Sequence, residues 1–510
     1  MKPTPQQQAI LDEIRDGTDN ILIRARAGTG KTTAILMAVD VLRQKSRTLE
    51  VCVCAFNKAI ADEVKAELNA RGHNDFKTTQ AATVHSLGFG LVRFVFRNPK
   101  VNQYKVRDIV DRFSVSNTSE VEPWVFKEFG PQIEKLVRVA KMSGVGFFDD
   151  MHIGDIGVWY ELADHYDVNG FDDTSSLDIV IRAAQLVYRF SLDTTSEIDF
   201  DDMVLFPLVK NLRVKFQKDV LFVDEAQDLS RARQALIKKF VKPSGRVIIV
   251  GDEKQAIYGF SGADANALEN LCRSLRAKVL PLSVTWRCPR SVVTLAQTIV
   301  PDIEAAPGAS EGRVDYIGEL PEAMGPETFI LCRNTAPLID IAYGLIRSGT
   351  PCKVEGRDIG EGLKTLLKRW KTKDLDDYTD RLSAYRDREV QKAEAKNRPE
   401  RAESINDKCD TVMAIVDECF KRGLTTINDA VAFVDDLFAD GVENVTTLAT
   451  YHRSKGREKQ RVILVEHDTR CPSGYAHQPW QLEQEDNLAY VAFTRAREEL
   501  LFYTPKVEAA

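Results

Sequence analysis

The sequence predicts an α/β fold with two parallel sheets, each interrupted by a mainly helical segment. Short apolar runs rich in β-branched residues alternate with longer helical stretches, a pattern typical of parallel sheets with crossover helices. Four of these runs precede residue 260 and four follow residue 325, so the strands form two sets. The expected strands are 21–24, 49–56, 220–224, 246–252, 328–333, 446–451, 461–466 and 499–504.

A strand-poor segment interrupts each set. Residues 96–195 carry apolar side chains at helical spacing, as in PQIEKLVRVAKM and SLDIVIRAAQLVYRF. The other segment covers about 359–441, and within it 25 of the 50 residues from 361 to 410 are charged. Such density favours solvated helices or a flexible arm over a packed core.

The composition of the 510-residue chain narrows its class. No run of some 18 apolar residues is present, and no secretion signal opens the sequence, so we expect no membrane contact and a cytoplasmic or nucleoid location. Nine cysteines without a CxxC pair indicate buried thiols in a reducing compartment. The net charge of -7 argues against a simple nucleic-acid coat protein, but it permits DNA binding in one lined channel.

A phosphate-binding loop follows the first expected strand. The sequence Ala-Arg-Ala-Gly-Thr-Gly-Lys-Thr-Thr fits this loop with alanine in place of its first glycine, and a helical stretch follows directly. Small residues let backbone N–H groups approach phosphates, and the helix N-terminus favours their charge. We expect Lys31 to reach the β- and γ-phosphates and Thr32 to ligate Mg²⁺. The other expected nucleotide-binding residues of the loop are Ala27, Gly28, Thr29, Gly30 and Thr33.

A pair of carboxylates ends the strand at 220–224. Asp224 and Glu225 lie where ligands of open α/β sheets collect. Alone, such a pair is more often a turn or a helix cap. Together with the phosphate loop it predicts that Asp224 holds Mg²⁺ and that Glu225 orients or deprotonates the attacking water.

The segment after the fourth strand carries a resemblance to a known family. Residues 251–263, GDEKQAIYGFSGA, resemble motif III of the superfamily 1 DNA helicases of the UvrD/Rep type. The resemblance implies that Gln255 senses the γ-phosphate and that Tyr258 and Phe260 stack on DNA bases. Aromatic faces can grip a single strand without reading its sequence, although either ring alone would more often be ordinary core packing.

Further motifs of the first half follow in the family's order. PTPQQQAIL resembles the motif that reads adenine, with Gln7 preferred over its glutamine neighbours. AFNKA and TVHSL resemble motifs Ia and Ib, which contact DNA. They imply DNA-binding roles for Phe56, Asn57, Lys58 and His85.

The second half contains three more such blocks. VTWR resembles motif IV, which implies that Trp286 stacks on adenine and that Arg287 approaches the γ-phosphate. TYHRSKGRE resembles motif V and NLAYVAFTRA resembles motif VI. The residues of motif VI are most similar to those of the F-box helicase-like and phage branch of the family. They imply a ribose contact for Glu458, DNA contacts for Thr450 and His452, and a second arginine finger at Arg495.

The resemblance implies four domains and a motor. RecA-like domains 1A and 2A would carry insertions 1B and 2B, and ATP with Mg²⁺ would bind between the RecA-like cores. We expect an ATP hydrolase that moves 3′ to 5′ on single-stranded DNA and unwinds single/double-strand junctions. We expect it to act as a monomer, and single-strand-binding or loader proteins are candidate partners. A translocase that displaces bound proteins is the alternative, favoured by the short 2B. The expected boundaries are 1–95 with 196–283 (1A), 96–195 (1B), 284–358 with 442–510 (2A) and 359–441 (2B).

A mixture of basic and aromatic residues lies near the start of the first insertion. The run Arg93–Lys100, with Tyr104, Lys105 and Arg107, combines cations and rings as a strand-contacting face would. An amphipathic helix end with a solvated basic side explains it equally well.

Overall fold

The computed structural model groups the chain into two compact units. The first comprises Met1–Ala25 and Gly30–Leu282, and the second comprises Arg26–Thr29 and Ser283–Ala510. The described residues are 3–505 apart from 56, 74, 76, 117–119, 167, 169–173, 259–263, 265, 371, 373, 396–398, 439–443 and 478.

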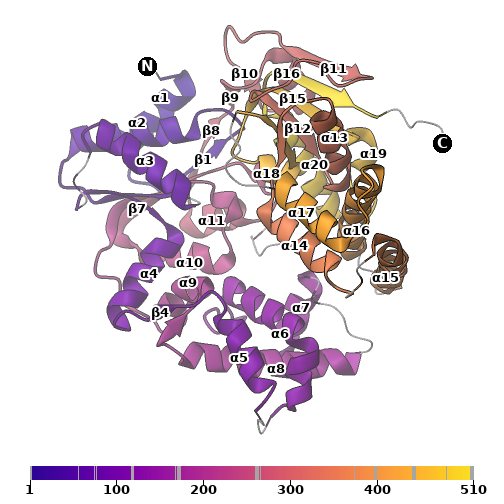
Figure 1. Ribbon diagram of the computed structural model, residues 1–510. Coiled ribbons are helices and arrows are strands. Elements are labelled where there is room, and N and C mark those ends of the chain that lie inside the picture. The colour runs from indigo at the N-terminus through magenta and orange to yellow at the C-terminus, as the bar shows by residue number, and fades with distance from the viewer. Residues whose placement is uncertain are drawn as a thin grey trace. The chain divides into compact units, whose positions relative to one another are not determined.

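The first unit is built on a six-stranded sheet in which all neighbouring strands are parallel (Figure 1). Its order is β3-β2-β6-β7-β1-β8, so β7 separates β1 from β6. The carboxyl ends of these three strands therefore share one edge of the sheet. The strands are β1 (Ile21–Ala25), β2 (Val51–Ala55), β3 (Thr79–Thr83), β6 (Lys218–Val223), β7 (Val241–Gly251) and β8 (Lys278–Leu282).

Alternating side chains bury both faces of this sheet. In β1, Ile21 and Ile23 face α1, α2 and α3, while Leu22 faces the helices on the other side. Cys52 and Cys54 of β2 are buried free thiols that pack on this second face. The helices are α1 (Pro5–Asp16), α2 (Lys31–Lys45) and α3 (Lys58–Ala70) on one face and α4 (Val84–Val95), α9 (Phe200–Val209), α10 (Arg231–Lys239) and α11 (Ala267–Leu275) on the other.

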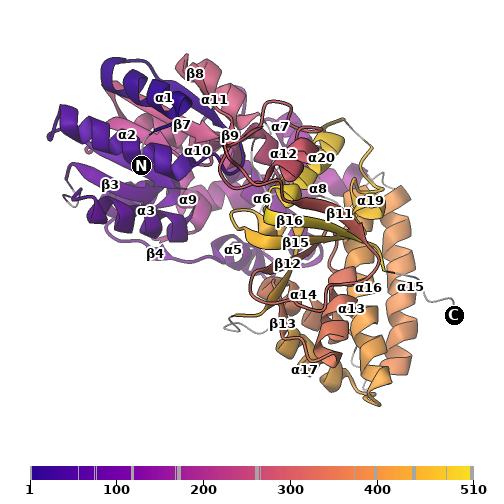
Figure 2. The ribbon, with the colours of Figure 1, turned by 90° about the horizontal axis from the view of Figure 1, so that it is seen from above.

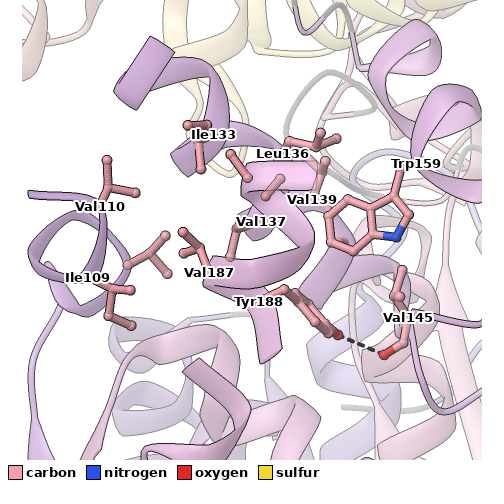
Figure 3. Close-up of a cluster of buried hydrophobic side chains, with 14 of the residues drawn as sticks. Ile109, Val110, Ile133, Leu136, Val137, Val139, Val145, Trp159, Val187 and Tyr188 are labelled. Atoms are coloured by element: carbon pink, nitrogen blue, oxygen red, sulfur yellow. Dashed lines mark hydrogen bonds between the residues drawn. The ribbon is translucent and has the colours of Figure 1, made fainter. Parts of the chain in front are cut away.

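A helical insertion of the first unit packs around a core of its own (Figure 3). Apolar residues of α6, among them Ile133 and Leu136, belong to the same core as the buried rings of Trp159 and Tyr188. The Tyr188 hydroxyl donates a hydrogen bond of 2.7 Å to the Val145 carbonyl, which satisfies its polar atom within the core. The elements are β4 (Lys100–Val101), α5 (Lys105–Phe113), α6 (Pro123–Ser143), α7 (Ile156–His165), α8 (Thr174–Asp193) and β5 (Glu197–Ile198).

A buried ionic network ties this insertion to α9 under the sheet. Lys141 Nζ lies 2.6 Å from an Asp199 oxygen and 2.7 Å from an Asp202 oxygen, and Lys105 Nζ lies 2.7 Å from the other Asp202 oxygen. Burial opposes the charge of Lys141, but Asp202 and Asp199 outweigh it and raise the lysine's pKa. Grouping Lys105 with an exposed basic face was therefore wrong, because its ammonium is enclosed by this network.

The second unit contains another six-stranded sheet with only parallel neighbours, in the order β11-β16-β15-β12-β14-β13. A separate parallel pair consists of β9 (Val284–Thr285) and β10 (Glu304–Ala305). The sheet strands are β11 (Arg313–Ile317), β12 (Thr328–Cys332), β13 (Cys352–Val354), β14 (Thr446–Thr450), β15 (Lys459–Val465) and β16 (Ala496–Tyr503). The flanking helices are α12 (Arg290–Ala296), α13 (Ala336–Arg347), α18 (Tyr451–Ser454), α19 (His467–Arg470) and α20 (Pro479–Phe493).

The charged segment of the second unit forms helices with a packed core. Figure 2 shows α15 and α16 side by side. Tyr378 and Leu382 of α15 are buried with Val412 of α16, so the expectation of solvated helices or a flexible arm instead of a core was wrong. The few apolar residues recur at helical spacing, and most of the charges lie on outer faces, with Glu418 of α16 a buried exception. The helices are α14 (Arg357–Leu367), α15 (Leu375–Ala395), α16 (Pro399–Lys421) and α17 (Ile427–Leu437).

The predicted fold class is confirmed: two parallel sheets, each accompanied by a mainly helical insertion. The eight expected strands correspond to β1, β2, β6, β7, β12, β14, β15 and β16. The four domain boundaries stay a prediction. Among the described residues, we find no helix that combines the length and the apolar character needed to span a membrane.

Loss of one cation from the buried network should destabilise the first unit. We expect Lys141→Met to lower the free energy of unfolding by about 3–5 kcal/mol, because the buried Asp199 carboxylate loses its lysine and Asp202 keeps only Lys105. Chemical denaturation followed by circular dichroism measures the change. The matched control, Lys127→Met on the exposed face of the same helix, should unfold within about 0.5 kcal/mol of the wild type.

Candidate active site

Three neighbouring strands of the first sheet end beside one another and bring the expected phosphate-site residues together. Lys31 opens α2 after β1, and Glu225 follows β6 by two residues. The Lys31 ammonium donates to a Glu225 carboxylate oxygen at 2.6 Å. Burial opposes the lysine charge, but Glu225 and Asp224 outweigh it, so the pKa of Lys31 is raised. Lys31 is therefore held as a cation at the end of the phosphate loop, where α2 begins.

A chain of hydrogen bonds runs from Glu225 to Gln255. The Gln227 amide in η1 (Ala226–Asp228) donates to Glu225 at 2.5 Å, and its oxygen accepts from the Asp252 backbone N–H at 3.1 Å. The Gln255 amide in η2 (Glu253–Gln255) donates to Asp252 at 2.8 Å. A change at the carboxylate can therefore reach Gln255 through two intermediate side chains.

The oxygen atoms expected to hold Mg²⁺ suit that ion. Asp224 is buried at the end of β6, and Thr32 lies in the first turn of α2. Burial raises the pKa of Asp224 to about 6, with Glu225 adding repulsion and Lys31 opposing the rise. A carboxylate whose charge is so penalised gains from a nearby cation, and a carboxylate with a hydroxyl is a donor set that Mg²⁺ accepts.

The adenine-motif glutamine lies next to the phosphate loop. Gln7 is buried in α1, and its amide oxygen accepts from Thr4 N–H in a capping box. Its amide nitrogen lies 3.7 Å from the place where a side chain on Gly30 would begin. Gln8 instead extends to Asp12 on the outer face of the helix.

Four residues of the phosphate loop group with the second unit and make contacts within it. Arg26 is buried and forms a forked ion pair with Asp302, with its Nε 2.9 Å from one oxygen and its Nη2 2.9 Å from the other. The Ala27 N–H donates to the Tyr490 hydroxyl at 2.9 Å, and the Gly28 carbonyl accepts from the Trp286 N–H at 2.8 Å. Thr29 is buried, and its hydroxyl donates to the Arg26 carbonyl at 2.9 Å.

The arginines of motifs IV and VI are occupied by partners inside the second unit. Arg287 pairs with Glu458 and donates to the Thr494 carbonyl at 3.3 Å. Arg495 is fully buried, and its Nε donates to the Val491 carbonyl at 2.7 Å. Burial lowers the pKa of Arg495 to about 9, and Arg287 adds repulsion.

The remaining nucleotide candidates of the second unit differ in exposure. Trp286 is 58% exposed, so its ring face is open for stacking. Glu458 also pairs with Arg497 at 2.7 Å, in addition to Arg287. A ribose hydroxyl would therefore compete with two arginines for the Glu458 carboxylate.

The expected DNA contacts of the first unit lie at strand ends and helix starts. Asn57 caps α3 by accepting from the Ile60 N–H at 2.9 Å, and Lys58 is exposed beside it. Burial lowers the pKa of His85 to about 4, with Arg233 adding repulsion, so its ring is neutral. Tyr258 is half-buried. Phe56 and Phe260 lie outside the described residues.

Motif V places the last two DNA candidates at the end of β14. Thr450 ends this strand, and His452 lies in α18. Burial lowers the pKa of His452 to about 3, with Arg333 adding the largest repulsion. A neutral imidazole contacts DNA by hydrogen bonding or packing rather than by charge.

The sequence interpretation gave no role to four residues that the structure brings into these contacts: Gln227, Asp252, Asp302 and Tyr490. Asp252 and Tyr490 stand inside quoted motifs, and Gln227 stands two residues after the carboxylate pair, so their polar side chains were a usable signal. Asp302 stands outside every motif, and nothing in the sequence pointed to it.

Gly28 is a position where a side chain should not fit. Its φ is +71°, and an added Cβ would lie 2.5 Å from both Arg287 Cβ and Thr285 Oγ1. We expect Gly28→Ala to lower the unfolding midpoint and to weaken nucleotide binding. The control is Gly72→Ala, because Gly72 has a similar φ of +81° with nothing within 4 Å. The control should lose only the ~1–2 kcal/mol of stability that an alanine at positive φ costs. Equal effects of the two variants would contradict a steric clash at Gly28.

Asp224 should make stability depend on pH. Its folded-state pKa of about 6, against an ordinary 3.8, means that the ionised group destabilises the fold above pH 6. This corresponds to about 3 kcal/mol, and the penalty disappears as the pH falls from about 6 to about 4. We expect Asp224→Asn to be more stable than wild type at pH 8 and equal to it near pH 4, by chemical denaturation without nucleotide. The control is Asp62→Asn at an exposed site, which should unfold within about 0.5 kcal/mol of the wild type.

Comparison with known proteins identifies a family. Residues 4–275 match the UvrD/REP helicase N-terminal domain, and residues 357–506 match the UvrD-like helicase C-terminal domain. The ATP-dependent DNA helicase srs2 of Schizosaccharomyces pombe is 23% identical over 56% of this chain and 33% of that protein. The ATP-dependent DNA helicase Rep of Escherichia coli is 23% identical over 59% of this chain and 43% of its own.

A mitochondrial relative, the ATP-dependent DNA helicase HMI1 of Saccharomyces cerevisiae, is 23% identical over 64% of this chain and 45% of that protein. The matched part thus spans a third to less than half of each relative. The first family match alone covers more than half of the present chain. The chain belongs to the UvrD/REP helicase family.

Proposed function

We propose that the chain is an ATP-dependent DNA helicase that moves on single-stranded DNA and hydrolyses ATP to ADP and phosphate. The observation that carries the proposal is the connected path from Lys31 through Glu225 and Gln227 to Gln255. It links the residue that would bind the terminal phosphates to the motif that would contact bases. The relatives' names, ATP-dependent DNA helicases, support the same activity.

In the hydrolytic step, Lys31 would exchange its partner Glu225 for the triphosphate. A triphosphate would attract the Lys31 ammonium away from Glu225, which frees that carboxylate to accept a proton from water. Mg²⁺, held by Thr32 and Asp224, would neutralise phosphate charge. Asp252 holds the Gln255 amide, and Gln227 connects Asp252 to Glu225, so the Gln255 side chain could respond to the presence of the γ-phosphate.

The arginines of the second unit would complete charge neutralisation at the phosphates. Arg287 would leave Glu458, and Arg495 would exchange carbonyl partners for the γ-phosphate. Because each guanidinium is already engaged, this exchange couples nucleotide binding to rearrangement inside the second unit. Repeated exchange would drive steps along the strand, and we propose a 3′ to 5′ direction with single/double-strand junctions as substrates.

The phosphate-site lysine provides the direct test. We expect Lys31→Ala to abolish ATP hydrolysis stimulated by single-stranded DNA, because the variant lacks the ammonium that would bind the β- and γ-phosphates. Binding of a labelled single strand should stay measurable in that variant. Wild-type turnover by Lys31→Ala would refute the site, and the exposed Lys65→Ala on α3 should hydrolyse ATP normally.

Strand displacement tests the motor and its direction. We expect the wild type to unwind a duplex with a 3′ tail in the presence of ATP and to leave a 5′-tailed duplex intact. Hydrolysis with removal of a bound protein but no unwinding would instead favour the protein-displacing translocase. Binding of DNA without stimulated hydrolysis would exclude both motors.

A further inference from the structure

Two segments of the first unit that lie far apart in sequence form an exposed surface of aromatic and basic side chains. Lys215, in the loop after α9, places its ammonium 4.6 Å from the ring centroid of Phe94 in the last turn of α4. We call this surface the Phe94 patch. Its residues are Arg93, Phe94, Arg97, Arg213, Lys215 and Phe216.

The aromatic members of the patch face solvent. Phe94 is 64% exposed and Phe216 is 73% exposed, whereas most large apolar side chains of this unit are buried. A single exposed ring is ordinary. Here Phe216 directly follows Lys215, the residue that contacts Phe94, so a second exposed ring and several exposed cations belong to the same two segments. The Lys215 ammonium over the Phe94 ring is a cation–π contact, which attracts the two side chains to each other.

The charge of the patch is uniformly positive. Residues 88–107 and 203–218 contain no aspartate or glutamate, in a chain whose net charge is -7. Nearby cations already serve other groups, since Lys100 pairs with Glu197 at 2.9 Å and Lys105 belongs to the buried network. Within the part of the chain that the structure describes, no salt bridge engages Arg93, Arg97, Arg213 or Lys215.

We propose that the Phe94 patch binds a single-stranded polynucleotide, with its cations on phosphates and Phe94 and Phe216 stacked on bases. Exposed rings need unstacked bases, which a single strand provides and an intact duplex does not. This inference rests on the proposed function, because it assumes that the chain moves on a single strand. The patch is separate from the motif contacts, because His85 and Phe94 occupy opposite ends of α4, about 14 Å apart along the helix.

Binding of labelled oligothymidylates of increasing length to the full chain tests the patch. We expect Phe94→Ala/Phe216→Ala to weaken binding of long strands at least about tenfold and to leave the shortest bound strand nearly unaffected. Arg213→Glu/Lys215→Glu should reduce the dependence of log affinity on log salt by about 1.4, for two lost phosphate contacts. The controls are Trp124→Ala, at a 51% exposed ring of α6, and Lys127→Glu in the same helix.

The results separate the patch from the proposed function. An oligouridylate series shows whether the patch binds DNA alone or both DNA and RNA. In either case, a loss of oligothymidylate affinity in the Phe94→Ala/Phe216→Ala variant supports the patch. Unchanged affinity for long strands, an equal loss for the shortest strand, or an equal loss for blunt duplex would overturn it. Failure of wild-type chain to hydrolyse ATP with the short strand would refute the proposed function and leave the patch result standing.

Discussion

The ion pair between Lys31 and Glu225 is the contact on which the nucleotide site depends. It joins residues 194 positions apart in sequence, and it forms because β1 and β6 deliver them to one edge of a parallel sheet. Each ion offsets the desolvation cost of the other in the nucleotide-free chain. Under the proposed function, a triphosphate takes Glu225's place on Lys31. Nucleotide binding and release of the catalytic carboxylate then become one event, and Asp224 becomes the carboxylate that most needs a metal ion.

A second constraint attaches the helical insertion to the same sheet. Asp199 and Asp202 cap the start of α9 with their side chains and also hold two lysines of the insertion. One helix start therefore serves as both a cap and an anchor. Because α9 packs on a sheet face and α6 contributes to the insertion core, displacement of the insertion would expose paired charges. The insertion and the sheet should thus move together as one body during any cycle.

Much of the fold could be predicted because its central strands, such as β7 with Val247 to Val250, are continuous runs of β-branched residues. The weaker strands β3 and β8 escaped prediction, since TQAAT has no apolar run and KVLPL contains proline. At the site, the motifs indicated that Lys31 and Glu225 lie close together, and the two side chains form an ion pair, while their roles stay predictions. The motifs could not indicate that Arg26 pairs with Asp302, because that pairing depends on a loop outside every motif. Nor could they indicate which histidine is neutral, because burial decides that.

The negative net charge restricts where this chain can hold a polyanion. Lys31 of the nucleotide site is paired with Glu225, and the histidines expected near DNA are neutral, so neither supplies strong attraction for a strand. Attraction must then come from places where cations gather without acids. Among the described residues, the two acid-free segments around Phe94 and Lys215 provide such a place. A strand drawn there would meet exposed rings as well as charge, which is the combination that holds single strands without regard to sequence.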